Sequence, residues 1–259
     1  MPCTHNTAPT QSVEANGIRY AYRRFGAGDG LPLVCLQHFR GGLDNWDRLV
    51  TDGLAENRSV ILFNNAGIAT SSIREDFWEN PVRFWTIDDD DYRRFLEINT
   101  LSAVRLASLV APEMIARSWG RIVNVTTSLS TMLLAGQAAY SVSKAGLEAV
   151  TSVMAGDLAG TGVTANVLAP GGPADTRMVV GLNVPREALI PADCMAAPAV
   201  WLASNASDGV TGRRFLGIKW DPALPRAEAA IRAGAPVAWT GYGDQMRPPA
   251  GGMPPQKPS

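Results

Sequence analysis

A tyrosine and a lysine one helical turn apart have the types and spacing needed for proton transfer. Tyr140 and Lys144 follow the strand-like run of residues 121–126. Side chains at i and i+4 of a helix are neighbours, so the Lys144 ammonium can favour the phenolate of Tyr140. Lowering a tyrosine pKa from about 10 to about 7 requires roughly 4 kcal/mol, much of which a partly desolvated cation can supply. The pair indicates a general acid/base, although a packed helix face is the common alternative.

Four more polar motifs accompany this pair in a defined order. Thr127 and Ser128 stand at the end of the strand-like run, where a hydroxyl can hydrogen-bond a substrate oxygen or simply cap the strand end. The other motifs are the Asn-Asn-Ala-Gly string at 64–67, Asn99 in a long helical stretch, and Pro-Gly at 170–171 after another strand-like run.

Together these motifs resemble the short-chain dehydrogenase/reductase family, over about residues 59–220. The resemblance implies hydride transfer between a nicotinamide cofactor, NAD or NADP, and a small carbonyl or alcohol substrate. Tyr140 would be the acid/base, and Lys144 would lower its pKa and hold the nicotinamide ribose. Thr127 or Ser128 would orient the reacting oxygen, and Asn99 would complete a proton relay through water. The cofactor contacts implied by the resemblance are Asn65, Ala66, Gly67, Tyr140, Lys144, Pro170, Gly171 and Thr176.

The first sixty residues depart from that family's pattern. They contain no Thr-Gly-x-x-x-Gly-x-Gly turn to receive a pyrophosphate, and no acidic residue placed to read the adenosine ribose. Arg40, followed by two glycines, supplies charge and close backbone approach at the corresponding place. We therefore expect weak dinucleotide binding, with a Kd of about 1 mM or worse, and poor discrimination between NADH and NADPH.

Residues 13–69 resemble instead the N-terminal part of an α/β-hydrolase, whose His-x-x-Gly-Gly segment helps form an oxyanion hole. The sequence thus predicts a chimera joined near residue 64. Triad hydrolysis is not expected, because the chain has no Gly-x-Ser-x-Gly elbow and both histidines, His5 and His38, precede any candidate nucleophile. Two alternatives to the oxidoreductase remain: a catalytically impaired scaffold without a complete cofactor site, and a hydrolase with an unconventional site.

The predicted fold is α/β and Rossmann-like, with a mostly parallel sheet flanked by helices. Alternation around an Asn-Gly turn predicts an N-terminal β-hairpin at 13–25. We expect the strand at 31–37 to lie parallel to the strand at 59–63, with the hairpin covering the exposed edge. The dinucleotide-binding half would then be truncated.

One domain is expected over residues 13–220, with a hydrolase-like part at 13–63 and a dehydrogenase-like part at 64–220. Residues 1–12 are expected to be disordered, and the Pro-rich residues 221–259 to form an extended or disordered tail. Asp88–Asp91 is interpreted as a helix cap. Residues 77–85 are interpreted as a loop, and the family resemblance places a lid over the substrate at 177–191.

Composition narrows the classes of partner. The chain has 259 residues, of which 46% are hydrophobic and 18% charged, as is usual for one soluble α/β domain. A net charge of −1 gives no reason to expect nucleic acid or an anionic membrane. No transmembrane run or signal peptide is evident, and three cysteines without metal-type spacing indicate the cytoplasm and no metal site. The family resemblance implies a homodimer or homotetramer.

Overall fold

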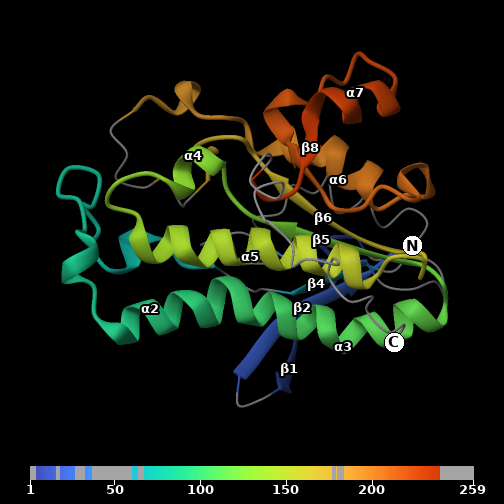
Figure 1. Ribbon diagram of the computed structural model, residues 1–259, viewed down its shortest axis with the longest axis horizontal. Helices are drawn as coiled ribbons and strands as arrows, with labels where there is room; N and C mark the ends of the chain where they lie inside the picture. Colours follow the sequence, from blue (N-terminus) through green and yellow to red (C-terminus); the bar gives the residue numbers. More distant parts are fainter. Residues whose placement is uncertain are drawn as a thin grey trace, which may run out of the picture.

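The computed structural model describes residues 4–15, 18–26, 33–36, 60–63, 67–176, 179 and 184–239. Within these residues one sheet has the order β1-β2-β4-β3-β5-β6-β7-β8. Helices cover both of its faces (Figure 1), which confirms the predicted α/β, Rossmann-like class. The strands are β1 Gln11–Ala15, β2 Ile18–Phe25, β3 Leu33–Leu36, β4 Val60–Phe63, β5 Gly120–Val125, β6 Val163–Ala169, β7 Arg213–Leu216 and β8 Gly234–Pro236.

The parallel part of the sheet runs from β4 through β3, β5 and β6 to β7. Every residue of β5 and β6 is buried, as expected for parallel strands that carry helices on both faces. The predicted pairing of the strand at 31–37 with the strand at 59–63 is confirmed, since β3 lies parallel to β4. Parallel strands end at one edge of a sheet, so the segments after β5 and β6 meet there.

The N-terminal hairpin forms as predicted, and β2 extends the sheet antiparallel to β4. The expectation that residues 1–12 are disordered is wrong for the described part. Gln11 and Ser12 belong to β1, while His5 and Ala8 are buried. The His5 ring meets the Phe25 ring edge-on at 5.8 Å between centroids, so packing on β2 orders a segment that composition alone marks as polar.

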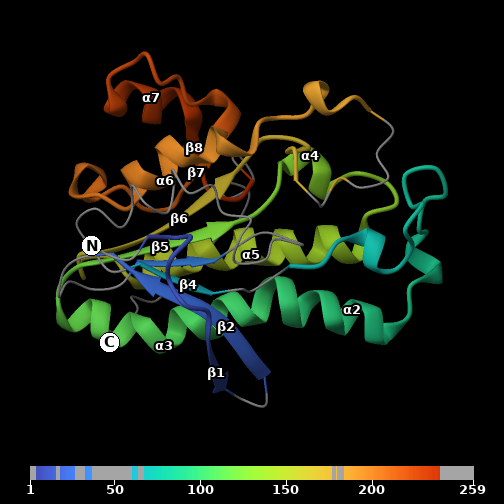
Figure 2. The same ribbon diagram turned by 180° about the vertical axis from the view of Figure 1, so that it is seen from behind.

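Two long helices pack on one face of the sheet, and shorter helices pack on the other (Figures 1 and 2). α3 and α5 cover the first face, and α6 and α7 cover the second. A π-helical turn at Glu97–Leu101 joins α2 to α3. The helices are α2 Asp89–Leu96, α3 Ser102–Ala116, α4 Leu129–Met132, α5 Ala138–Asp157, α6 Ala196–Leu202 and α7 Arg226–Ala233.

The acidic run before α2 is a helix cap, as the sequence indicates. The Asp88 carboxylate accepts a hydrogen bond from the Asp91 backbone N–H at 2.7 Å. Asp89, Asp90 and Asp91 fill the first turn, where negative charge complements the helix dipole.

The first part of the predicted C-terminal tail is ordered, so that prediction is wrong over residues 221–239. This part contains α7, and β8 pairs antiparallel with β7. Its prolines lie at element ends: Pro225 is the residue before α7, and Pro236 ends the edge strand β8, positions where a missing N–H costs little. Ala229, Ala230 and Ala233 are buried in the core. Residues 240–259 lie outside the described residues.

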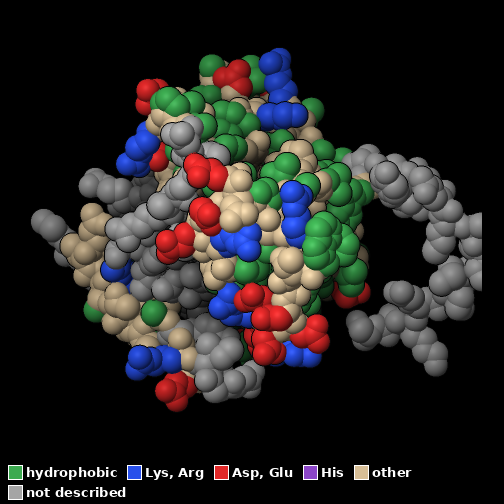
Figure 3. Space-filling model, turned by 90° about the vertical axis from the view of Figure 1, so that its left-hand side faces the viewer, with side chains coloured by type: hydrophobic (Ala, Val, Ile, Leu, Met, Phe, Trp, Pro, Cys, Tyr) green, Lys and Arg blue, Asp and Glu red, His purple; other side chains and the backbone are tan. Residues whose placement is uncertain are grey.

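Acidic and basic side chains are intermixed on the face shown in Figure 3, in keeping with the small net charge. Exposed ion pairs such as Arg93–Asp90, at 2.8 Å, also join side chains of opposite charge at the surface. Among the described residues, no helix combines the length and the apolar character needed to cross a bilayer.

Candidate active site

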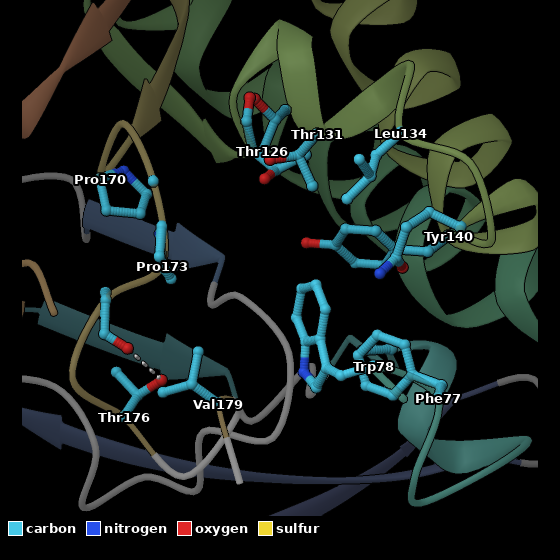
Figure 4. A pocket seen from close by; sticks show the side chains of 15 residues that line it. Phe77, Trp78, Thr126, Thr131, Leu134, Tyr140, Pro170, Pro173, Thr176 and Val179 are labelled. Carbon is cyan, nitrogen blue, oxygen red and sulfur yellow. Dashed lines mark hydrogen bonds between the residues drawn. The ribbon is translucent and has the colours of Figure 1, made fainter. Parts of the chain in front are cut away.

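A cavity of about 220 Å³ opens where β5 and β6 end. Its walls come from the segments after β4, β5 and β6, from α4 and from the start of α5 (Figure 4). The lining residues include four predicted site residues: Tyr140 and Thr127, expected to be catalytic, and Pro170 and Thr176, expected to contact the cofactor.

Tyr140 and Thr127 meet at this cavity, joined by a side-chain hydrogen bond. The Tyr140 hydroxyl points into the space between Trp78 and Pro173 (Figure 4). Burial raises the pKa of Tyr140 to about 12, because the phenolate would lose its hydration, and the Thr127 hydrogen bond opposes that rise. At neutral pH this phenol is therefore a proton donor.

Ser128, the other predicted hydroxyl, serves as a helix cap. Its Oγ accepts a hydrogen bond from the Thr131 backbone N–H at 3.2 Å and lies 2.6 Å from the Thr131 hydroxyl. Ser128 does not line the cavity, whereas Thr127 does. The geometry thus separates two neighbours that the sequence leaves as alternatives.

Lys144 is almost completely buried one turn after Tyr140 on α5. Its ammonium donates to the Val125 carbonyl oxygen at 3.2 Å, and no other partner is found among the described residues. Burial lowers the pKa of Lys144 to about 8. The expectation that Lys144 lowers the pKa of Tyr140 is not met in this structure, because loss of hydration dominates at the phenol.

We expect Lys144→Met to raise the free energy of unfolding, and we expect this gain to shrink as the pH rises. The pKa of Lys144 is about 8 in the folded chain, against 10.5 for a lysine that is not buried. Between pH 8 and 10.5 the unfolded chain holds this proton and the folded chain does not, so the free energy of unfolding of the wild type rises with pH across this window. That stability is lost again as the pH falls through 8. The gain in unfolding free energy from the substitution should be larger at pH 7 than at pH 10 by about 2 kcal/mol.

Denaturant titrations of the two proteins at both pH values measure this difference, with Lys219→Met, at an exposed position, as the control. An equal effect of Lys144→Met at pH 7 and pH 10 would show that the ammonium is not desolvated.

Asn99 lies in the π-helical turn and does not line the cavity. Its Oδ1 accepts from the Ile68 N–H at 2.7 Å, and its amide group donates to the Ile68 carbonyl and to the Ser143 hydroxyl, each at 2.9 Å. Both amide hydrogens are therefore used in clamping the segment after β4 to α5.

The remaining predicted cofactor residues are only partly described. Gly67 is buried next to the Asn99 clamp. Gly171 has a φ of +105°, and a Cβ there would lie 2.6 Å from Ile218, so only glycine fits this turn. Asn65, Ala66 and Arg40 lie outside the described residues.

Sequence reasoning missed several side chains that line the cavity, among them two aromatic residues and a glutamine. Phe77 and Trp78 lie in the segment interpreted as a plain loop, and their rings stack at 4.5 Å between centroids. Gln137, three residues before Tyr140, accepts a hydrogen bond from Thr70 at 2.5 Å. The adjacent aromatic pair was the available signal, but only the tertiary structure brings it opposite Tyr140.

A buried ion pair lies directly behind the strand end that carries Thr127. Glu148, one turn after Lys144 on α5, accepts from Arg214 Nε on β7 at 2.8 Å. Its other oxygen accepts from the Thr126 hydroxyl at 2.8 Å. Arg214 also donates to the Thr127 carbonyl oxygen at 3.0 Å. The pair thus ties α5, β7 and the end of β5 together.

The comparisons with known proteins point to one family. A family model described as short chain dehydrogenase matches residues 45–186. Nodulation protein G of Azospirillum brasilense is 33% identical over 161 residues, covering 59% of this chain and 61% of the relative. The 3-oxoacyl-(acyl-carrier-protein) reductase of Salmonella typhimurium is 32% identical, covering 59% and 62%. The chain thus matches less than two thirds of the length of these relatives.

The fold also has a solved counterpart. A gluconate 5-dehydrogenase from Burkholderia cenocepacia, solved with NADP and tartrate, superposes with a TM-score of 0.50. The sequences are 23% identical, and the match covers 64% of this chain and 74% of the other. At this identity the likeness concerns the fold.

The family match does not support the predicted chimera. It begins at residue 45, inside the segment interpreted as hydrolase-like, and extends past residue 64 to residue 186. Polar and glycine motifs in a strand-loop-helix start are shared by many α/β proteins, which makes the short hydrolase-like string a weak guide.

Proposed function

The chain belongs to the short-chain dehydrogenase family, and from this we propose that it transfers a hydride between NAD(P) and a small carbonyl or alcohol compound. The observation that carries the proposal is the meeting of the Tyr140 phenol and the Thr127 hydroxyl at one cavity, with the buried Lys144 ammonium one turn away. A carbonyl oxygen placed there would accept from both hydroxyls.

In the direction of reduction, Tyr140 gives its proton to the substrate oxygen as negative charge develops on it. Thr127 orients that oxygen and donates to it. The new C–H bond takes the hydride, the new O–H bond takes the phenolic proton, and the phenolate regains a proton from solvent. A pKa of about 12 keeps Tyr140 protonated at neutral pH, which favours its role as an acid.

The residues of the nicotinamide half fit such a cofactor. The Lys144 ammonium has three hydrogens and one described acceptor, so it retains donors for ribose hydroxyls. Pro170 and Thr176 line the same cavity as Tyr140. When bound, the reduced nicotinamide supplies the hydride.

We further propose that dinucleotide binding is weak. Arg40, Asn65 and Ala66 would contact the cofactor, with Arg40 near the pyrophosphate, and the usual glycine-rich turn is replaced by Phe39-Arg40-Gly41-Gly42. Asn99 would act by holding the segment after β4 in place. A relay through water would not use its amide hydrogens, since both are already bonded.

Loss of the near-ultraviolet absorbance of NADH or NADPH on mixing with the full chain and butane-2,3-dione tests this function. We expect slow loss with both cofactors and half-saturation near or above about 1 mM. Binding of NADH or NADPH without any turnover would favour the impaired scaffold. Absence of both binding and turnover would overturn the proposal.

A homodimer or homotetramer is also proposed, with α3 and α5 as the contact surface. The two helices lie side by side on one face (Figure 1). They expose Leu109 and Val153, which are 66% and 58% accessible, together with Val142. Exposed apolar side chains on adjacent helices are characteristic of subunit contacts.

The cytoplasm is the proposed location, supported by the cysteine content of the sequence. No observation on the described residues favours the hydrolase alternative. His5 packs against Phe25 and does not line the cavity, and His38 lies outside the described residues.

A further inference from the structure

The lining of the cavity carries information about the substrate. We propose that the site selects compact, uncharged aryl carbonyl compounds, and that Trp78 is the residue that determines this specificity. This inference rests on the proposed function, because it concerns the same cavity.

The size of the cavity favours a compact substrate, because the nicotinamide proposed to lie beside Pro170 and Thr176 shares the same space. The volume of the cavity is about 220 Å³. An apolar cavity of about 150 Å³ is enough to bind benzene. This volume is smaller than the roughly 300–1,000 Å³ of sites that bind drug-sized ligands. The space that remains beside a nicotinamide suits a group of about one ring with its carbonyl.

The residues that line the cavity disfavour a charged substrate. None of the described lining residues is Lys, Arg, His, Asp or Glu. The nearby charged groups have other roles: Lys144 donates to the Val125 carbonyl and keeps its remaining hydrogens for the ribose in the proposed function, and Glu148 pairs with Arg214. A carboxylate or phosphate entering the cavity would lose its hydration without a counter-ion, which is costly.

The aromatic wall offers a face for a ring. Phe77 is buried and stacks on Trp78 with an interplanar angle of 36°, which holds the indole in place. The six-membered ring of Trp78 points toward the Tyr140 hydroxyl (Figure 4). A substrate ring against this indole would leave its carbonyl beside Tyr140 and Thr127, the two hydroxyls that act on it.

The indole nitrogen indicates a further contact. Trp78 Nε1 is buried and has no hydrogen-bond partner among the described residues. A buried donor without an acceptor carries a penalty that a ligand oxygen can remove. We therefore assign to the substrate a second neutral acceptor, such as an ester or a second carbonyl oxygen.

The test compares two probes that differ in charge, methyl benzoylformate and the benzoylformate anion. With NADH or NADPH, kcat/KM for the ester is expected to exceed that for the anion by about 100-fold, because the anion would be buried unpaired. Equal turnover of the two probes would overturn the proposal.

Variants of Trp78 test the role of the indole. Trp78→Ala should lower kcat/KM for the ester by about 10-fold or more, mostly by raising KM, and should lower it less for butane-2,3-dione, which has no ring to pack on the indole. Trp78→Phe should retain part of the effect, because it keeps a ring and loses the N–H. Trp85→Ala is the matched control, since Trp85 is 69% exposed and does not line the cavity.

Calorimetric binding of the two probes to the full chain, without cofactor, separates this inference from the proposed function. Binding of the ester that Trp78→Ala abolishes and Trp85→Ala preserves supports the inference even if no compound is reduced. If the wild-type chain reduces butane-2,3-dione, and Trp78→Ala binds and reduces the ester as well as the wild type does, the inference is refuted and the proposed function stands. Failure of the wild-type chain to bind the ester also refutes it.

Discussion

Tyr140→Phe is expected to lower the rate of carbonyl reduction by about 10²- to 10⁴-fold, the usual contribution of a positioned general acid. The substitution removes one oxygen from a buried ring that still packs against Ala69, Phe95 and Ala139. The free energy of unfolding should therefore change by only about 1 kcal/mol. Steady-state kinetics with butane-2,3-dione and denaturant unfolding measure the two effects.

Tyr92→Phe, on the partly buried α2, is the matched control, because Tyr92 does not line the cavity. Wild-type turnover by Tyr140→Phe would refute the assignment of the acid.

The reverse reaction provides a pH test of the same group. Alcohol oxidation needs the phenolate, whose fraction rises with pH toward the pKa of about 12, so the oxidation rate should increase through the alkaline range.

Glu148→Ala is expected to destabilise the fold by about 3–5 kcal/mol, because it leaves Arg214 buried without its counter-ion. The side chains of Glu148 and Arg214 are 0% and 7% exposed. The substitution also takes the acceptor from the Thr126 hydroxyl. Chemical denaturation near neutral pH measures the loss.

Glu113→Ala is the matched control for this prediction. Glu113 pairs with Arg117 on the surface, where both side chains are at least half exposed, so its loss should cost no more than about 1 kcal/mol. A Glu148→Ala protein as stable as the Glu113→Ala protein would show that the buried pair does not hold the strand end. Since Arg214 donates to the Thr127 carbonyl, a folded Glu148 variant should also show a higher KM.

Local spacing accounts for the parts of the site that the sequence predicts. Tyr140 and Lys144 lie on one helix, so their proximity follows from the helical repeat alone. The parallel pairing of β3 with β4 follows from the right-handed crossover that the sequence predicts between two consecutive strands. Such features depend on few residues and on geometry that every helix or crossover shares.

Features that depend on tertiary packing could not be predicted in this way. Thr127 and Ser128 are adjacent in sequence, and only the start of α4 shows that Ser128 is the cap. Trp78 is about sixty residues from Tyr140, and only the tertiary structure brings the segment after η2, Thr70–Ser72, to the same cavity. The pKa of Tyr140 rises because burial outweighs the opposing effect of the Thr127 hydrogen bond, a balance that spacing does not reveal.

Composition was misleading at both ends of the chain. The Pro-rich stretch after residue 220 contains a helix and an edge strand, because its described prolines occupy positions where no N–H is needed. The polar start is ordered because the His5 ring packs against Phe25. Buried partners decided the outcome in both cases.

Isotope transfer tests the central claim, that this chain moves a hydride to a carbonyl carbon with Tyr140 as the acid. The full chain is incubated with butane-2,3-dione and a reduced nicotinamide dinucleotide that carries deuterium at both C4 positions, and the alcohol is examined by mass spectrometry. The account predicts one deuterium on the new carbinol carbon of the wild-type product and almost none with Tyr140→Phe. An alcohol formed without the label, or labelled equally well by Tyr140→Phe, would contradict it.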